Sequence, residues 1–186
     1  MAAWERFLQN GEVAPNTLRA PIESSWSRCL SAGVDPARVQ APTVLPAEEL
    51  MTLRALHREL IEASVPIMAQ AREFLSASGT ILMLTDPRGI VLQTEGDPSA
   101  LEAALDIRLM PGANWTELNC GTNAIGTALS TREPVQVHAC EHFCIGSSLG
   151  PVPPPSCTTP STARFLVRST SRGFSVPSTI IVSRSC

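Results

Sequence analysis

The chain of 186 residues contains no lysine and no tyrosine, and aromatic residues make up only 4% of it. Because the phosphate-cradling motif G-x-x-x-x-G-K-[ST] requires a lysine, the chain cannot contain that motif. No apolar run reaches the roughly 20 residues that a membrane span needs, and the first residues lack the apolar core of a secretory signal. We therefore expect a soluble, cytoplasmic protein with no membrane partner, whose six cysteines are reduced.

Acidic residues are absent from the C-terminal segment. Residues 1–150 carry ten Arg and all 17 acidic residues, a net charge of −7, whereas residues 151–186 carry four Arg and no acid, a net charge of +4. Such asymmetry is typical of an interaction tail or a segment of different origin. We divide the chain into an N-terminal helical segment and linker (1–46), a main domain (47–150) and a Pro/Ser/Thr/Arg-rich tail (151–186) that is irregular over most of 151–177.

Hydrophobic spacing predicts helices in the first half of the chain. Residues 3–33 contain short helices, in which Trp26 and Cys29 are expected to be core anchors. A longer helical pattern runs over 47–77, and Pro66 is expected to kink it or split it in two. This pattern packs either on the sheet of its own domain or against a copy of itself, which leaves a homodimer open.

A β-hairpin is predicted next, because the apolar runs 81–85 and 90–94 flank a turn of sequence Asp-Pro-Arg-Gly. A helix over 98–106, an irregular loop over 108–115, a helix from Thr122 as its cap to about residue 131, and a strand over 135–138 follow. The order is that of an α+β fold. Gly126 is about 1 kcal/mol less favourable in a helix than alanine, so either close packing of the helix on the sheet or room for a ligand is expected to require it.

A cluster of polar residues, His138-x-Cys140-Glu141-His142-x-Cys144, follows the predicted strand. Structural zinc sites draw their ligands from two separated segments, so a single short span does not predict a metal site. A nucleophilic cysteine would need a thiolate beside a base, for which His138 or His142 qualifies. The third interpretation is the polar rim of a binding pocket, with neutral histidines.

Four segments occur in an order that resembles a known family. They are SSWSRCLSAGVDP (24–36), LTDPRGIVLQTEGD (84–97), GANWTELNCGTNAIGTAL (112–129) and PVQVHACEHF (134–143). They are similar to the N-terminal sensor region of sigma-54-dependent transcriptional activators of the acetoin-catabolism-regulator type. The resemblance implies a GAF domain, in which helices flank an antiparallel sheet of six strands and one face holds a pocket for a small ligand.

The resemblance also implies a function and a site. It implies a ligand-sensing module without catalysis, whose partner is a small-molecule effector and which uses no cofactor and no metal and does not contact nucleic acid directly. Its ligand-binding residues are then expected to be Trp115, Glu117, Asn119, Gly121, Thr122, Asn123, Gly126 and Thr127, followed by His138, Glu141 and His142.

The chain departs from this family in two respects. The ATPase and helix-turn-helix domains that follow in the family have no room here, so neither ATP hydrolysis nor enhancer binding is expected. The tail also lacks the family's closing segment, so the sheet is expected to be incomplete at its C-terminal strands, with 178–182 pairing onto the open edge. Plausible codons read from the third base of the Pro151 codon restore a family-like sequence, which indicates a frameshift between residues 143 and 152.

Three alternatives to the sensor interpretation remain open. One is a cysteine-dependent redox enzyme with a GAF fold, resembling free-methionine-sulfoxide reductases and using Cys140 or Cys144. Another is a metal- or redox-sensing switch built on the 138–144 cluster. The last is a nonfunctional, frameshifted fragment.

Overall fold

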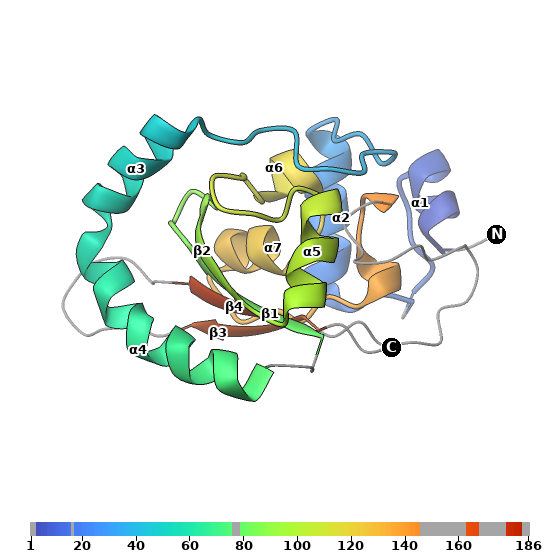
Figure 1. The fold of residues 1–186 in the computed structure, drawn as a ribbon. Helices are drawn as coiled ribbons and strands as arrows, with labels where there is room; N and C mark the ends of the chain where they lie inside the picture. The colour runs from blue at the N-terminus through green and yellow to red at the C-terminus, as the bar shows by residue number, and fades with distance from the viewer. Residues whose placement is uncertain (1–2, 16, 76–78, 146–162, 168–177, 184–186) are drawn as a thin grey trace.

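The computed structural model describes residues 3–15, 17–75, 79–145, 163–167 and 178–183 (Figure 1). The helices are α1 (Ala3–Asn10), α2 (Ala20–Ser31), α3 (Ala47–Leu56), α4 (Arg58–Leu75), α5 (Pro98–Asp106), α6 (Glu117–Cys120) and α7 (Ala124–Thr131), with a short 3-10 helix η1 (Ala139–Glu141). The strands are β1 (Thr80–Thr85), β2 (Val91–Gly96), β3 (Ala163–Val167) and β4 (Ser178–Ser183). The α+β class is therefore confirmed.

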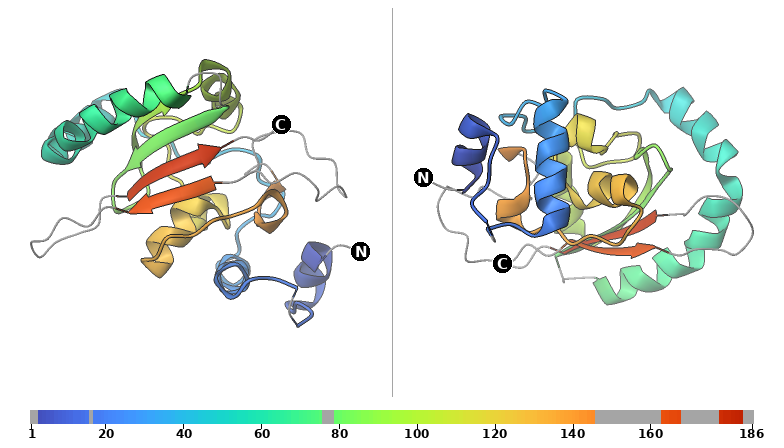
Figure 2. Two further views of the ribbon diagram at one scale, coloured as in Figure 1. Left: turned by 90° about the horizontal axis from the view of Figure 1, so that it is seen from below. Right: turned by 180° about the vertical axis from the view of Figure 1, so that it is seen from behind.

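The strands form one antiparallel sheet of order β2-β1-β4-β3. Helix α4 packs on one face of the sheet, while α5 and α7 pack on the other. Helices α2 and α1 lie beyond α7 (Figure 2). All of β1 is buried, because side chains that alternate along it enter two different cores. Ile81 and Met83 join a cluster under α5 and α7, whereas Leu82 and Leu84 join a cluster under α4.

The predicted hairpin turn is present between β1 and β2. The Asp86 carboxylate accepts hydrogen bonds from the backbone N–H groups of Arg88 (2.9 Å) and Ile90 (2.8 Å). Gly89 closes the turn at φ +78°. The predicted helix at 98–106 is also present, and Asp97 caps it by accepting from Ser99 N–H at 2.8 Å.

The break in the long helical pattern lies at His57, and the prediction that Pro66 would split it is wrong. Pro66 lies inside α4, which continues to Leu75. His57 ends α3 at φ −100°, and its Nε2 lies 4.0 Å from an Asp86 carboxylate oxygen. The bend brings Leu53 of α3 and Met68 of α4 into one cluster on the sheet, which explains the position of the break.

Two segments of the tail lie in the sheet. The segment predicted to pair with the open edge does so, since β4 is antiparallel to β1 with Thr80 opposite Ser183. Residues 163–167 form β3, although irregular structure was predicted there. An unpaired strand edge favours such additions, because its N–H and C=O groups need partners. The other tail predictions lie outside the described residues.

No strand forms at 135–138, so that prediction is wrong. The alternation that suggested a strand is real, because Val135 and Val137 are buried, but the segment has no strand neighbour among the described residues. Side chains satisfy its backbone instead. The Gln136 carbonyl accepts from Arg19, and the His138 N–H donates to the Glu141 carboxylate at 2.8 Å.

Candidate functional site

Most of the predicted site residues meet where α2 packs against α6 and α7. Glu117, at the start of α6, is the centre of a polar network that we call the Glu117 network. Its carboxylate accepts from Arg28 at 2.7 and 2.8 Å and from the Ser25 hydroxyl at 2.5 Å. The Ser25 hydroxyl also lies 2.7 Å from the Thr122 hydroxyl and 3.2 Å from that of Thr127. Ser130 of α7 completes the network, donating to Glu117 at 3.2 Å.

The Glu117 carboxylate remains charged although only 4% of the residue is exposed. Burial alone disfavours the carboxylate, but hydrogen bonds from Arg28, Ser25 and Thr127 outweigh it and lower the pKa of Glu117 below its ordinary value. The hydrogen bonds to Glu117 raise the pKa of Arg28, so the pair is ionised at neutral pH. The network is therefore centred on an ion pair whose carboxylate also accepts hydrogen bonds from hydroxyl groups.

Helix α7 begins one residue later than predicted. Asn123, and not Thr122, is the cap: its side-chain carbonyl accepts from Gly126 N–H at 2.9 Å, and its amide donates to Gly121 O at 2.8 Å. An asparagine at this position satisfies donors that the first helical turn leaves open. The Thr122 hydroxyl is thereby left to bond with Ser25.

Two glycines allow backbone segments to approach closely. A Cβ on Gly126 would lie 2.4 Å from Glu117 N and 2.8 Å from Thr116 C, so the absence of a side chain lets α7 contact the start of α6. Gly121 has φ +67°, and a Cβ there would lie 2.7 Å from the Cys144 sulfur. Close packing thus accounts for Gly126, although against α6 and not against the sheet.

The second predicted group forms a neighbouring contact. Glu141 accepts from both Arg19 nitrogens, with Nε–Oε1 at 2.8 Å, and its backbone carbonyl accepts from the Trp26 indole at 2.7 Å. The His142 Nδ1 bonds to the Thr122 carbonyl at 3.0 Å. Burial lowers the pKa of His142 to about 4, so the ring is neutral at pH 7 and donates to that carbonyl.

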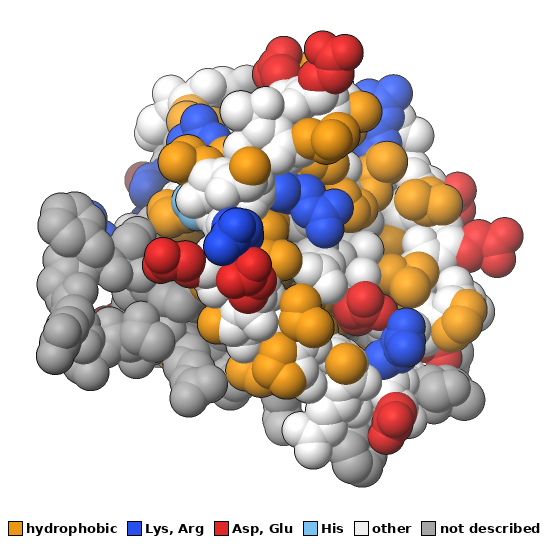
Figure 3. All heavy atoms as spheres, turned by 60° about the vertical axis from the view of Figure 1, so that its left-hand side comes forward, with side chains coloured by type: hydrophobic (Ala, Val, Ile, Leu, Met, Phe, Trp, Pro, Cys, Tyr) orange, Lys and Arg blue, Asp and Glu red, His pale blue; other side chains and the backbone are white. Residues whose placement is uncertain are grey.

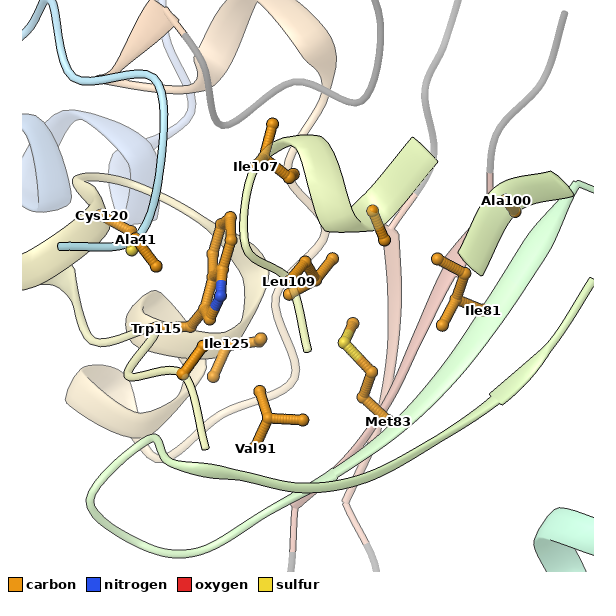
Figure 4. Packing of buried hydrophobic residues seen from close by; sticks show 12 residues of the cluster. Ala41, Ile81, Met83, Val91, Ala100, Ile107, Leu109, Trp115, Cys120 and Ile125 are labelled. Carbon is orange, nitrogen blue, oxygen red and sulfur yellow. The ribbon is translucent and has the colours of Figure 1, made fainter. Parts of the chain in front are cut away.

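Trp115 and Asn119 lie apart from these groups. Trp115 is 4% exposed and packs in the cluster on the α5 and α7 side of the sheet, with Ile125, Leu109 and Val91 around it (Figure 4). Its indole donates to Arg108 O at 3.3 Å. The Asn119 carbonyl accepts from Arg38, a residue of the linker after α2.

Sequence reasoning missed three partners from this region: Arg19, which precedes α2 as its N-cap, and Ser25 and Arg28 within the helix. Ser25 and Arg28 lie within the first segment that resembles the family, SSWSRCLSAGVDP, in which helical spacing indicates only Trp26 and Cys29 as core anchors. Both of those residues are core anchors, at 1% and 0% exposure. The sequence did contain one signal of a buried polar contact, because the charged Arg28 is next to Cys29, which was predicted to be buried.

Three buried cysteines have thiols that are not activated as nucleophiles. Burial raises the pKa of the Cys144 thiol to about 12, that of Cys120 to about 12 and that of Cys29 to about 11, so these thiols stay protonated near pH 7. Among the described residues, no three His, Cys, Asp or Glu side chains lie together as metal ligands would.

An open groove of about 580 Å³ lies on another face of the molecule, between α3 and the hairpin turn. Leu53, Leu56 and Ile90 contribute apolar walls, and Glu48 and Arg88 contribute charge. None of the predicted site residues lines it. Figure 3 shows the side of the molecule that carries α3 and α4, with hydrophobic side chains among acidic and basic ones.

The fold resembles that of a solved structure. The structure of the DhaR(N)–DhaL complex from E. coli superposes with a TM-score of 0.74 over 88% of this chain and 51% of that chain, at 18% identity. The expected class, a GAF-like domain with helices on both faces of an antiparallel sheet, is therefore confirmed. The described strands number four, where the resemblance implies six.

The chain belongs to the family described as MimR, N-terminal domain, which matches residues 1–169. It is 36% identical over 149 residues to the acetoin dehydrogenase operon transcriptional activator AcoR of Bacillus subtilis, covering 80% of this chain and 25% of that protein. It is 32% identical over 142 residues to the propane 2-monooxygenase operon transcriptional activator MimR of Mycolicibacterium smegmatis, covering 76% and 23%. The resemblance to acetoin-type regulators is thus confirmed, and the chain spans about a quarter of the length of these relatives.

Proposed function

We propose that this chain is the sensor domain of a transcriptional activator and that it responds to a small-molecule effector. The match of residues 1–169 to the N-terminal domain of such activators carries this proposal. The domain itself performs no catalysis and does not contact DNA, and it works in the cytoplasm, where transcription is regulated. The redox alternative has no support among the relatives, and the raised pKa of Cys144 disfavours its thiolate.

The proposed effector site comprises the Glu117 network and the adjoining residues 138–142. The hydroxyls of Thr122 and Thr127 and the Glu117 carboxylate supply donors and acceptors within one small volume, all nearly inaccessible to water. A ligand in this site must form hydrogen bonds with these buried groups. The site therefore discriminates strongly against a ligand that lacks a matching polar group, because the buried donors and acceptors would stay unpaired. The name of the Bacillus subtilis relative mentions acetoin, so small alcohols and ketones are the class that we propose for the effector.

Ligand-induced stabilisation tests this proposal. A panel of small alcohols and ketones is added to the full chain, and the unfolding temperature is measured for each compound. A true effector at about 100 times its Kd adds roughly 2.7 kcal/mol of stability. The variant Thr127→Val is expected to lose that gain, whereas Thr52→Val, on the exposed face of α3, keeps it. A gain of equal size in both variants would place the ligand elsewhere, and no gain from any compound would contradict the proposed class.

The same proposal includes a homodimer formed through residues 47–77. Met51 and Leu56 of α3 are 71% and 78% exposed, so both apolar side chains are available to a partner. Glu48 and Glu49 begin α3, and Arg54 lies in its last turn. Two α3 helices packed antiparallel about a two-fold axis therefore place acidic and basic ends opposite each other.

Light scattering of the full chain tests the dimer. We expect the wild-type mass to be twice that of the chain at micromolar concentration, and Met51→Asp with Leu56→Asp to shift it to the monomer without unfolding, since both side chains are exposed. Leu105→Asp, at a residue 53% exposed on α5, is the matched control and should leave the mass unchanged. A wild-type monomer across this range would contradict the proposed dimer and leave the effector site untouched.

A further inference from the structure

Two buried carboxylates hold the N-terminal helix pair, α1 with α2, on the rest of the molecule. Glu117 is 4% exposed and binds Arg28 through two hydrogen bonds, while Glu141 is 8% exposed and binds Arg19 through two more. Paired N–H···O bonds of this type fix both the position and the orientation of a guanidinium. We name Glu117 and Glu141, with the hydroxyls of Thr122 and Thr127, the two-carboxylate surface.

Further hydrogen bonds connect the helix pair to the rest of the molecule. Ser25 bonds to three groups of the surface, the Trp26 indole donates to Glu141 O at 2.7 Å, and the Trp4 indole donates to Phe143 O at 2.9 Å. An indole N–H and a guanidinium both find alternative partners in water. Water can therefore replace the polar part of the contacts that hold the helix pair.

The apolar contacts of the helix pair form a cluster of their own. Phe7, Ile22, Trp26 and Cys29 pack on residues of α7 and on Val137 and Phe143. The two clusters that cover the faces of the sheet contain no residue of α1 or α2. Removal of the helix pair would thus leave both sheet clusters intact, which is the arrangement expected of a unit that opens separately from global unfolding.

We propose that the two-carboxylate surface is a reversible docking site for the N-terminal helix pair, and that the effector acts by releasing this pair. The inference rests on the proposed function, because Glu117, Thr122 and Thr127 belong to the effector site and are the groups that Ser25 and Arg28 occupy. A ligand reaches these atoms once α2 has left them. Binding to the released state then shifts the population toward it.

Cys29 provides a reporter for the release. It is fully buried between α2 and the body, with its sulfur 3.8 Å from the Thr122 hydroxyl and 3.9 Å from Glu117 O. Cys120 is 2% exposed and lies in the sheet cluster beside Trp115, so it reports global unfolding. A maleimide reagent is added to the full chain without any effector, and mass spectrometry of peptides measures labelling at each cysteine over time.

Cys29 is expected to react at least tenfold faster than Cys120. Arg28→Gln should accelerate Cys29 about tenfold more, because a charge-assisted contact to a buried acceptor is lost, while the rate at Cys120 stays the same. Arg54→Gln, on exposed α3, is the matched control and should change neither rate. Equal rates at both cysteines, in the wild type and in Arg28→Gln, would overturn the proposal.

Amide hydrogen exchange of the wild-type chain provides a second measurement that needs no variant. The amides of α2 should exchange faster than those of α5, which packs on the sheet. Exchange of α2 at the same rate as α5 would overturn the docking model. Neither measurement uses an effector. A negative result would therefore contradict the docking proposal without deciding the thermal-shift test of the effector site.

Discussion

Replacing Gly126 with alanine is expected to destabilise the domain by about 2–3 kcal/mol, although alanine is the better helix former. Intrinsic propensity alone would favour the substitution by about 1 kcal/mol. The added Cβ would, however, lie 2.4 Å from Glu117 N, 2.8 Å from Thr116 C and 3.0 Å from Trp115 O. These are backbone atoms that cannot rotate away, so α7 must move off α6, and overpacking of this type costs up to about 3 kcal/mol.

Urea denaturation measures the effect as a change in the free energy of unfolding, and a fall of about 5–10 °C in the unfolding temperature should accompany it. Gly33→Ala is the control, because Gly33 has φ +68° but no atom within 4 Å of a built Cβ. It should lose only the roughly 1–2 kcal/mol of a left-handed conformation. Increased stability of Gly126→Ala would show that α7 and α6 do not touch as described.

Local features of the fold were predictable because they depend on neighbouring residues. The hairpin turn needs only Asp86, Pro87 and Gly89, and α5 needs only Asp97 and Pro98 at its start. The core role of Trp26 followed from helical spacing alone. Each of these predictions relies on backbone preferences that act over a few residues.

The errors arose where tertiary packing decided between local options. Thr122 and Asn123 both cap helices well, and the choice depends on Ser25, which lies 97 residues from Thr122 in the chain and bonds to it. Pro66 breaks helices in isolation, yet the bend occurs at His57, where both helices reach the same cluster on the sheet. Val135 and Val137 are both buried, as in a strand, but burial alone does not supply a strand partner.

The position of the site was predictable from the sequence, but the hydrogen-bond partners of its residues were not. The stretch from Glu117 to Glu141 holds five of the eleven buried polar or charged residues in the described part of the chain. Arg28 and Glu117 are separated by 89 residues, and no spacing rule connects them. The consequence is functional, because the residues expected to face an effector instead bind a helix of the same chain.

Glu117→Gln is expected to lower the free energy of unfolding by about 1.5–3 kcal/mol at pH 7, the range for hydrogen bonds to charged groups. The loss falls below that of a fully buried ion pair, because the Arg28 side chain is 40% exposed and water solvates it once the carboxylate is gone.

The dependence of this loss on pH shows whether the charge of Glu117 causes it. The pKa of Glu117 is lowered on folding, so its contribution is complete above the unfolded value of about 4.3 and is lost as the pH falls through the lower folded value. The difference between wild type and Glu117→Gln should therefore shrink on acidification from pH 5 downward, whereas Glu133→Gln, at an exposed residue after α7, should match the wild type at pH 7. A difference that stays constant on acidification would mean that Glu117 stabilises α2 by shape and not by charge.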